Sequence, residues 1–206
     1  RVMDWVLTAA DLTQNEFLII AGLAMLAGIV RGFSGFALSA MVMATAVVIL
    51  PPISLIPMLW FLEMSASILM LKNGWAGADK TMTYGLAGGS MIGWPIGIFL
   101  TASLPVAASK TVALSIIVIL AATLLAKIRM PFLATKSGLY GTGIVAGIAS
   151  GLASVGGMVV AIYVLAAQSP ANVMRASLVL YLFLTSVISL LILIFSGVMD
   201  VTSVIR

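Results

Sequence analysis

Residues 28–36 read GIVRGFSGF, which places a single arginine, Arg31, among glycines inside a long apolar stretch. A charge within membrane-buried sequence is costly unless it is paired or functional. Glycine interrupts helices because it is one of the poorest helix formers. A weaker copy of the stretch follows 119 residues later, where residues 147–157 read GIASGLASVGG. The two stretches predict two broken helices, one in each of two related halves.

The composition predicts an all-α polytopic membrane protein. The chain of 206 residues is 63% hydrophobic and only 8% charged, whereas soluble domains carry about 25% charged residues. Residues 32–62, 81–109, 137–174 and 176–199 are free of charge. Each run is longer than the roughly 20 residues that cross a bilayer as a helix.

The same composition argues against several other functions. The ten Lys and Arg residues are scattered, so no basic stripe indicates a nucleic-acid partner. Cysteine and histidine are absent, which removes thiolate chemistry and the usual metal ligand and general base. We therefore expect no metal, no cofactor and no enzymatic activity. The sequence also lacks a Gly-rich loop ending in Lys-Ser/Thr, so a nucleotide-driven pump is not indicated.

The hydrophobic pattern divides the chain into a lead-in and two repeats. Residues 1–16 form the lead-in. The first repeat, 17–127, comprises a hairpin at 17–50 and spans at 53–72, 81–103 and 107–126. The second repeat, 137–206, comprises a hairpin at 138–168 and a span at 171–196. Because two further spans would complete the second repeat, we expect about 45–50 more residues in the full-length protein.

Both hairpins are predicted to be re-entrant. Residues 17–31 would form a helix of about 22 Å, shorter than the hydrocarbon core of about 30 Å. We therefore expect two half-length arms, broken at Arg31-Gly32 and again at Ser34-Gly35. At an offset of 119 residues, Gly32 matches Gly151 and Pro51 matches Pro170.

Loop charges predict the orientation of the two hairpins. Residues 127–136 carry three basic and no acidic side chains, which places this loop in the cytoplasm. Residues 72–80 then lie on the same side, and the N-terminus lies outside. The second hairpin enters from the cytoplasm, with Arg175 inside and Asp200 outside. Each half therefore has the span count of an inverted repeat.

The two breaks resemble those of the sulfite exporter TauE/SafE family, also called the 4-toluene sulfonate uptake permease family. The resemblance is carried by residues 28–36, by residues 150–157, and by Ser169-Pro170 with residues 175–178. It implies a multi-pass transporter of sulfite or organosulfonates such as sulfoacetate in the cell inner membrane. The chain departs from the family pattern at Ala37-Leu38 and Met158-Val159.

The candidate substrate-binding residues lie at the two breaks: Arg31, Gly32, Ser34, Gly35, Ser150, Gly151, Ser154, Gly156 and Gly157. A guanidinium binds a sulfonate through two hydrogen bonds, and the start of each second arm directs a positive helix dipole at an anion. The alternatives are an arginine that reaches the membrane surface, glycines that allow close helix packing, and serines that cap helices. For Gly85, Gly88, Gly89, Gly93 and Gly97 we favour packing.

Four further residues are candidates for supporting roles. Glu63 is the only acid inside a predicted span; it either carries a coupling proton or forms a structural pair with Arg31. Arg175 is either a positive-inside anchor or part of the inner mouth of the pathway. Trp60 and Trp94 fall inside spans and are candidates to line the pathway.

We therefore predict a secondary transporter that binds a small sulfur-containing anion at the tips of two broken helices. The expected partners are this anion, the lipid bilayer and a coupling proton or ion. An anion channel with the same half-helix filter is the alternative.

Overall fold

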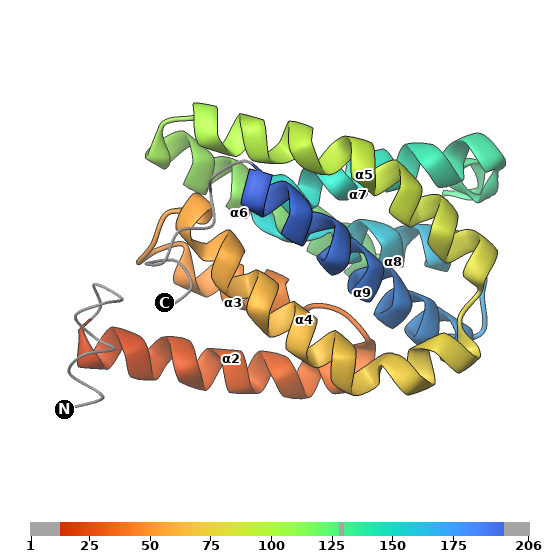
Figure 1. Cartoon of the computed structure of the whole chain (residues 1–206), viewed down its shortest axis with the longest axis horizontal. Helices are drawn as coiled ribbons and strands as arrows, with labels where there is room; N and C mark the ends of the chain where they lie inside the picture. Colours follow the sequence, from red (N-terminus) through yellow and green to blue (C-terminus); the bar gives the residue numbers. More distant parts are fainter. Residues whose placement is uncertain (1–12, 128–129, 196–206) are drawn as a thin grey trace.

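The computed structural model describes residues 13–127 and 130–195. This part of the chain contains helices and no strand, and the helices pack into one bundle (Figure 1). They are α2 (Gln14–Ser34), α3 (Leu38–Ala46), α4 (Pro52–Gly77), α5 (Lys80–Ser103), α6 (Val106–Leu125), the 3-10 turn η1 (Pro131–Ala134), α7 (Lys136–Ala153), α8 (Gly156–Ala166) and α9 (Ala171–Phe195). Most of the predicted lead-in, Arg129 and Asp200 lie outside the described residues.

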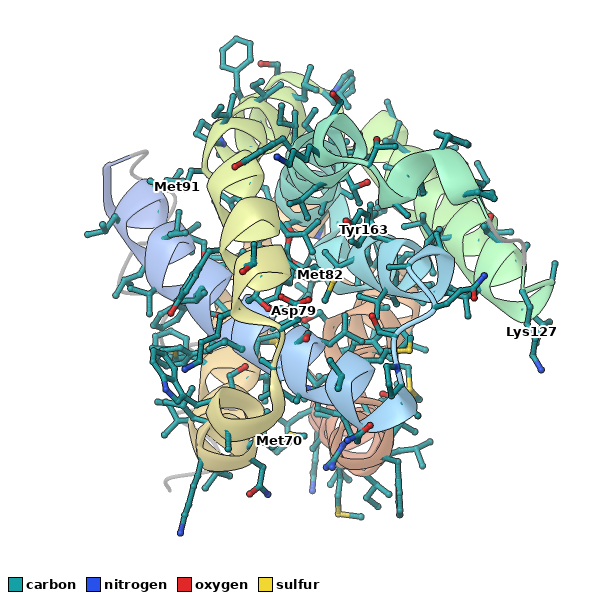
Figure 2. All side chains as sticks on the ribbon, turned by 90° about the vertical axis from the view of Figure 1, so that its right-hand side faces the viewer. Met70, Asp79, Met82, Met91, Lys127 and Tyr163 are labelled. Atoms are coloured by element: carbon teal, nitrogen blue, oxygen red, sulfur yellow. The ribbon has the colours of Figure 1, made fainter. Side chains whose placement is uncertain are left out.

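Five of the described helices are long and apolar enough to cross a membrane: α2, α4, α5, α6 and α9. Their outer faces expose large apolar side chains, such as Leu69 and Phe33, which are 86% and 82% exposed. Soluble proteins avoid large apolar patches of this kind. Figure 2 shows the two faces of α5, where Met82 is directed into the bundle and Met91 away from it. The prediction of an all-α polytopic membrane protein is confirmed.

The first hairpin has one long arm and one short arm. Helix α2 continues through Arg31 and Gly32 to Ser34, so its 21 residues span about 31 Å. The predicted break at Arg31-Gly32, and with it the half-length first arm, is wrong. Nothing lies within 4 Å of the position of a Cβ on Gly32, and a glycine in a helix costs only about 1 kcal/mol. The chain turns instead at Gly35 and Ala37, whose φ angles are 81° and 80°.

The short arm, α3, has 9 residues and is about 14 Å long. The second hairpin has the same design, because α7 has 18 residues and α8 has 11. Its turn lies at Ser154, a non-glycine residue with φ 55°. Only the second arm of each hairpin is therefore a half-length helix.

The two halves share helix ends at the 119-residue offset. Helix α2 ends at Ser34 and α7 at Ala153, while α4 begins at Pro52 and α9 at Ala171. In Figure 1, α2 starts and α3 ends on the left, whereas α7 starts and α8 ends on the right. The two hairpins thus enter the bundle from opposite ends, as inverted repeats require.

Helices α5 and α7 touch along their backbones. Gly85, Gly89, Gly93 and Gly97 recur every fourth residue on α5, and Gly143, Gly147 and Gly151 do so on α7. A Cβ on Gly147 would lie 2.6 Å from the carbonyl oxygen of Ser90, and one on Gly93 would overlap the carbonyl of Ile144. The interpretation of the α5 glycines as packing residues is confirmed except at Gly88, which faces open space. Small residues of this kind let membrane helices approach closely.

Two side-chain hydroxyl groups form hydrogen bonds across the same α5–α7 contact. Ser90 Oγ donates to the carbonyl oxygen of Gly143 at 2.9 Å, and Thr101 Oγ1 donates to that of Gly151 at 2.8 Å. The carbonyls are accessible because the glycines carry no side chain. The α5–α7 contact is therefore fixed in register as well as in distance.

We expect Gly93→Ala to lower the free energy of unfolding by about 1–3 kcal/mol, because the added methyl group forces two backbones apart. The matched control is Gly88→Ala on the same helix, which should be neutral or stabilising by up to about 1 kcal/mol through helix propensity. Thermal unfolding of the purified proteins in detergent compares them. Equal stability of the two variants would contradict the close α5–α7 packing.

Candidate functional site

A buried ion pair links the first hairpin to α4. Arg31, in the last turn of α2, is 1% exposed, and its Nη2 lies 3.0 Å from Glu63 Oε2. Nη2 also donates to Ser67 Oγ at 2.8 Å, and Nη1 donates to the carbonyl oxygen of Gly35 at 2.6 Å. A charge inside an apolar bundle requires such partners. Arg31 is therefore held inside the protein and does not extend to a membrane surface.

Glu63 also binds the start of α3. Its Oε1 accepts hydrogen bonds from Ser39 Oγ at 2.6 Å and from the Ser39 backbone N–H at 3.2 Å. Ala37, the N-cap residue of α3, provides no side-chain cap. A carboxylate from α4 thus occupies the position where a helix N-terminus attracts an anion. Glu63 ties α2, α3 and α4 together at one point.

The second half lacks both charges at the corresponding positions. At the 119-residue offset, Ser150 replaces Arg31 and Leu182 replaces Glu63. Helix α8, the counterpart of α3, begins without a side-chain cap at Val155. The positive end of the α8 dipole is therefore not matched by a carboxylate of its own half.

A polar cavity of about 50 Å³ lies at this place. It has room for about three to five water-sized groups, since about 10–15 Å³ of this measure holds one water molecule. Both counterpart residues, Ser150 and Leu182, contribute to its wall. The full lining is Ser39, Ile56, Leu59, Trp60, Glu63, Trp94, Ser150, Ser154, Leu182, Thr185, Ser186 and Ser189.

Three hydrogen-bond donors on the cavity wall have no partner among the described residues: the Ser150 and Ser154 hydroxyls and the indole N–H of Trp94. The remaining hydroxyls are engaged. Ser39 donates to Glu63, whereas Thr185, Ser186 and Ser189 donate to backbone carbonyls of α9. Unpartnered donors around a cavity of this size are suited to the oxygens of a small anion.

A smaller cavity continues this polar space to the first turn of α8. It shares Ser39, Glu63, Ser154 and Leu182 with the first cavity, and Gly157 forms part of its wall. The position of a Cβ on Gly157 lies 3.5 Å from Phe36 Cβ, so the turns of the two hairpins meet here. Glu63 is the one charged side chain among the residues that line the two cavities.

Six of the predicted site residues meet at these two cavities: Glu63, Trp60, Trp94, Ser150, Ser154 and Gly157. Trp60 is also fixed across the bundle, because its indole N–H donates to the carbonyl oxygen of Ser186 at 2.7 Å. The described cavity walls hold residues from the second break and from α3, α4, α5, α8 and α9. Arg31 contacts Glu63 but does not line either cavity.

The other predicted residues lie elsewhere. Gly32 is exposed, and Ser34 hydrogen-bonds the backbone around it at Val30 and Phe36. Gly151 belongs to the α5–α7 contact, and Gly156 packs against Ser150 and the carbonyl of Ala146.

Arg175 and Gly35 form a separate contact between the two halves. Arg175 Nη2 donates to the carbonyl oxygen of Gly32 at 2.6 Å, and its Cγ would lie 3.0 Å from a Cβ on Gly35. Gly35 is therefore required both for its positive φ and for space. Arg175 also lines a cavity of about 310 Å³ between α4 and α9, which shares no residue with the polar cavities.

Sequence reasoning missed Ser39, Leu182, Thr185, Ser186 and Ser189. The three α9 hydroxyls lie at positions i, i+1 and i+4 of an apolar span, which puts them on one side of the helix. This spacing, together with the offset match between Ser67 and Ser186, is the signal that could have identified the α9 wall. Nothing in the sequence pointed to Leu182.

The comparisons with known proteins give one match. The family model described as "Sulfite exporter TauE/SafE" matches residues 20–205, nearly the whole chain. No curated protein and no solved structure matches.

We expect Arg31→Leu to lower the free energy of unfolding by about 3–5 kcal/mol, because it leaves the Glu63 carboxylate buried without its partner. The double variant Arg31→Leu with Glu63→Leu removes both charges and should lose less stability than the single variant. Thermal or denaturant unfolding in detergent measures both. A double variant that is less stable than Arg31→Leu alone would contradict a mutually compensating pair.

Proposed function

Because the chain belongs to the sulfite exporter TauE/SafE family, whose members are membrane transporters and not enzymes, we propose that it is a secondary transporter of small sulfur-containing anions. The substrate class comprises sulfite and organosulfonates such as sulfoacetate. The site is the polar cavity at the second hairpin, and the membrane is the cell inner membrane. The unpartnered donors on the wall of this cavity carry the proposal.

The size and chemistry of the cavity support this substrate class. Its volume of about 50 Å³ suits a compact head group of a few heavy atoms. Ser150 and Ser154 at the end of α7 and Trp94 on α5 offer three donors, which matches an oxyanion with three oxygens. The N-terminus of α8 adds a partial positive charge, as broken helices do in other secondary transporters.

The position of the cavity supports alternating access. The turns of the two hairpins meet beside it, and the hairpins enter from opposite ends of the bundle. A site between two such elements opens to one side or the other when they shift relative to each other. Arg31 does not line the cavity, and its positive charge acts on the site through its ion pair with Glu63.

Purified protein in proteoliposomes tests this function. We expect saturable flux of sulfite or sulfoacetate that competes with other small sulfonates. Currents that rise linearly with voltage and do not saturate would instead indicate the channel alternative. Failure of any sulfonate to move or bind would contradict the proposed substrate class.

The variant Ser154→Gly is expected to lower sulfonate affinity without lowering the stability of the protein. Ser154 has φ 55°, a conformation that costs a non-glycine residue roughly 1–2 kcal/mol, so the variant should be as stable as the wild type or more so. Losing one hydrogen bond to a charged ligand costs about 1.5–3 kcal/mol, so sulfonate affinity should fall roughly tenfold to a hundredfold. Isothermal titration calorimetry measures the change.

The matched control for this variant is Gln168→Gly. Gln168 has φ 53° and lies exposed after α8, away from both cavities. It should share the backbone effect and leave affinity unchanged. Unaltered sulfonate affinity in Ser154→Gly would remove Ser154 from the site.

Leu182→Glu should block the site. It introduces a carboxylate at the position that Glu63 occupies in the first half, next to the start of α8. Like charges about 4 Å apart near a protein surface repel by about 4 kcal/mol, so sulfonate affinity should fall by more than roughly a hundredfold. Leu182→Met is the control of similar volume and should still bind. Sulfonate affinity unchanged from the wild type in a folded Leu182→Glu protein would place the anion elsewhere.

A further inference from the structure

The carboxylate of Glu63 stands in the way of the proposed substrate. It lines both polar cavities, so an anion bound there lies beside a negative charge. Two such groups do not share a confined site unless one of them is neutralised. A transporter for anions built around this cavity must therefore compensate Glu63 in each cycle.

The hydrogen bonds around the ion pair allow Glu63 to take up a proton without dismantling the site. Oε1 is held by Ser39 through its hydroxyl and its backbone N–H. Oε2 accepts no hydrogen bond from the described residues and lies 3.0 Å from Arg31 Nη2. A proton added at Oε2 thus displaces the ionic contact and leaves the Ser39 bonds in place.

Arg31 keeps its position and its charge when Glu63 is neutral. Its guanidinium remains bonded to the Gly35 carbonyl and to Ser67 Oγ. Its positive charge then lacks a counter-charge inside an apolar bundle, a costly arrangement. The cavities that Glu63 lines are where an anion could provide the missing counter-charge.

We infer that Glu63 is the coupling residue and that one proton enters with each anion. This inference rests on the proposed function. On binding, a proton from solution forms an O–H bond at Glu63 Oε2, and the anion replaces the carboxylate as the counter-charge of Arg31. On release, the O–H bond breaks, the proton leaves with the anion, and the ion pair re-forms. Proton and anion therefore favour each other's binding, and the coupling is reciprocal.

No other described group around the cavities is placed to take this role. Apart from Glu63, helices α3, α4, α5, α7, α8 and α9 contribute hydroxyls, tryptophans and apolar side chains to the two walls and no second titratable group. Lys110 reaches the Val48 carbonyl beyond the far end of α3. Arg175 binds the carbonyl of Gly32 and lines neither cavity.

The wild-type protein provides the first test, with isethionate as the probe because its sulfonate keeps its charge between pH 5 and 8. Binding in weakly buffered solution should take up one proton per anion, read with a pH-sensitive dye. The anion binds the protonated form, so affinity should rise as the pH falls, by at most about tenfold per pH unit for one coupled proton. Proton-free, pH-independent binding of isethionate overturns the coupling and leaves the proposed function intact.

The second test uses Glu63→Gln, which imitates the protonated side chain and retains an acceptor for Ser39. It should bind isethionate independently of pH, without proton uptake, and its transport in proteoliposomes should no longer respond to a pH gradient. The matched control is Asp79→Asn, which changes a carboxylate at the N-cap of α5 and should behave as the wild type. Transport by Glu63→Gln that still follows the pH gradient overturns the inference.

Two further outcomes are decisive. If Glu63→Gln does not fold, the proton count of the wild type still settles the question. Isethionate binding that requires sodium and takes up no proton overturns proton coupling in favour of a sodium ion. Absence of binding for every sulfonate at every pH refutes the proposed function itself, a result distinct from binding without proton uptake.

Discussion

The ion pair between Arg31 and Glu63 is the constraint on which the rest of the structure depends. Neither charge is tolerated alone in an apolar bundle, so α2 and α4 must bring them together at 3.0 Å. The second oxygen of the same carboxylate caps α3 through Ser39. One pair of side chains thereby sets the position of three helices and the turn between the arms of the first hairpin.

The second half of the chain has no ion pair at the corresponding positions. Its helices end at matching positions, yet Ser150 and Leu182 stand where the charges would be. A hydroxyl and an apolar side chain replace the guanidinium and the carboxylate, and a cavity lies beside them. The start of α8 has no side-chain cap from its own half. The first hairpin thus has its helix start matched by a carboxylate of its own half, whereas the second has a cavity there, lined by Ser150 and Leu182.

The sequence predicted the membrane class, the pair of hairpins and the packing role of the α5 glycines, because hydropathy and glycine spacing act locally. It misplaced the first break, since Gly32 faces open space and a helix tolerates it there. It placed Arg31 at the ligand and left a pair with Glu63 as the alternative, because the spacing from 31 to 63 does not decide whether the carboxylate reaches the guanidinium; the structure has the pair and leaves Arg31 off both cavity walls. The spacing of the α9 hydroxyls shows that they share one side of the helix, but which neighbours that side faces is decided by the packing of the other helices.

The glycine contact between α5 and α7 has a consequence for how the molecule divides into moving parts. Helix α5 belongs to the first repeat and α7 to the second, yet they meet backbone to backbone, with two hydroxyls bonded across. At Gly93, Gly97, Gly147 and Gly151 the contact is made by backbone atoms, which cannot change rotamer to absorb sliding. A helix of the first predicted repeat is therefore tied to a helix of the second, and we expect α5 and α7 to move as one unit in any conformational change.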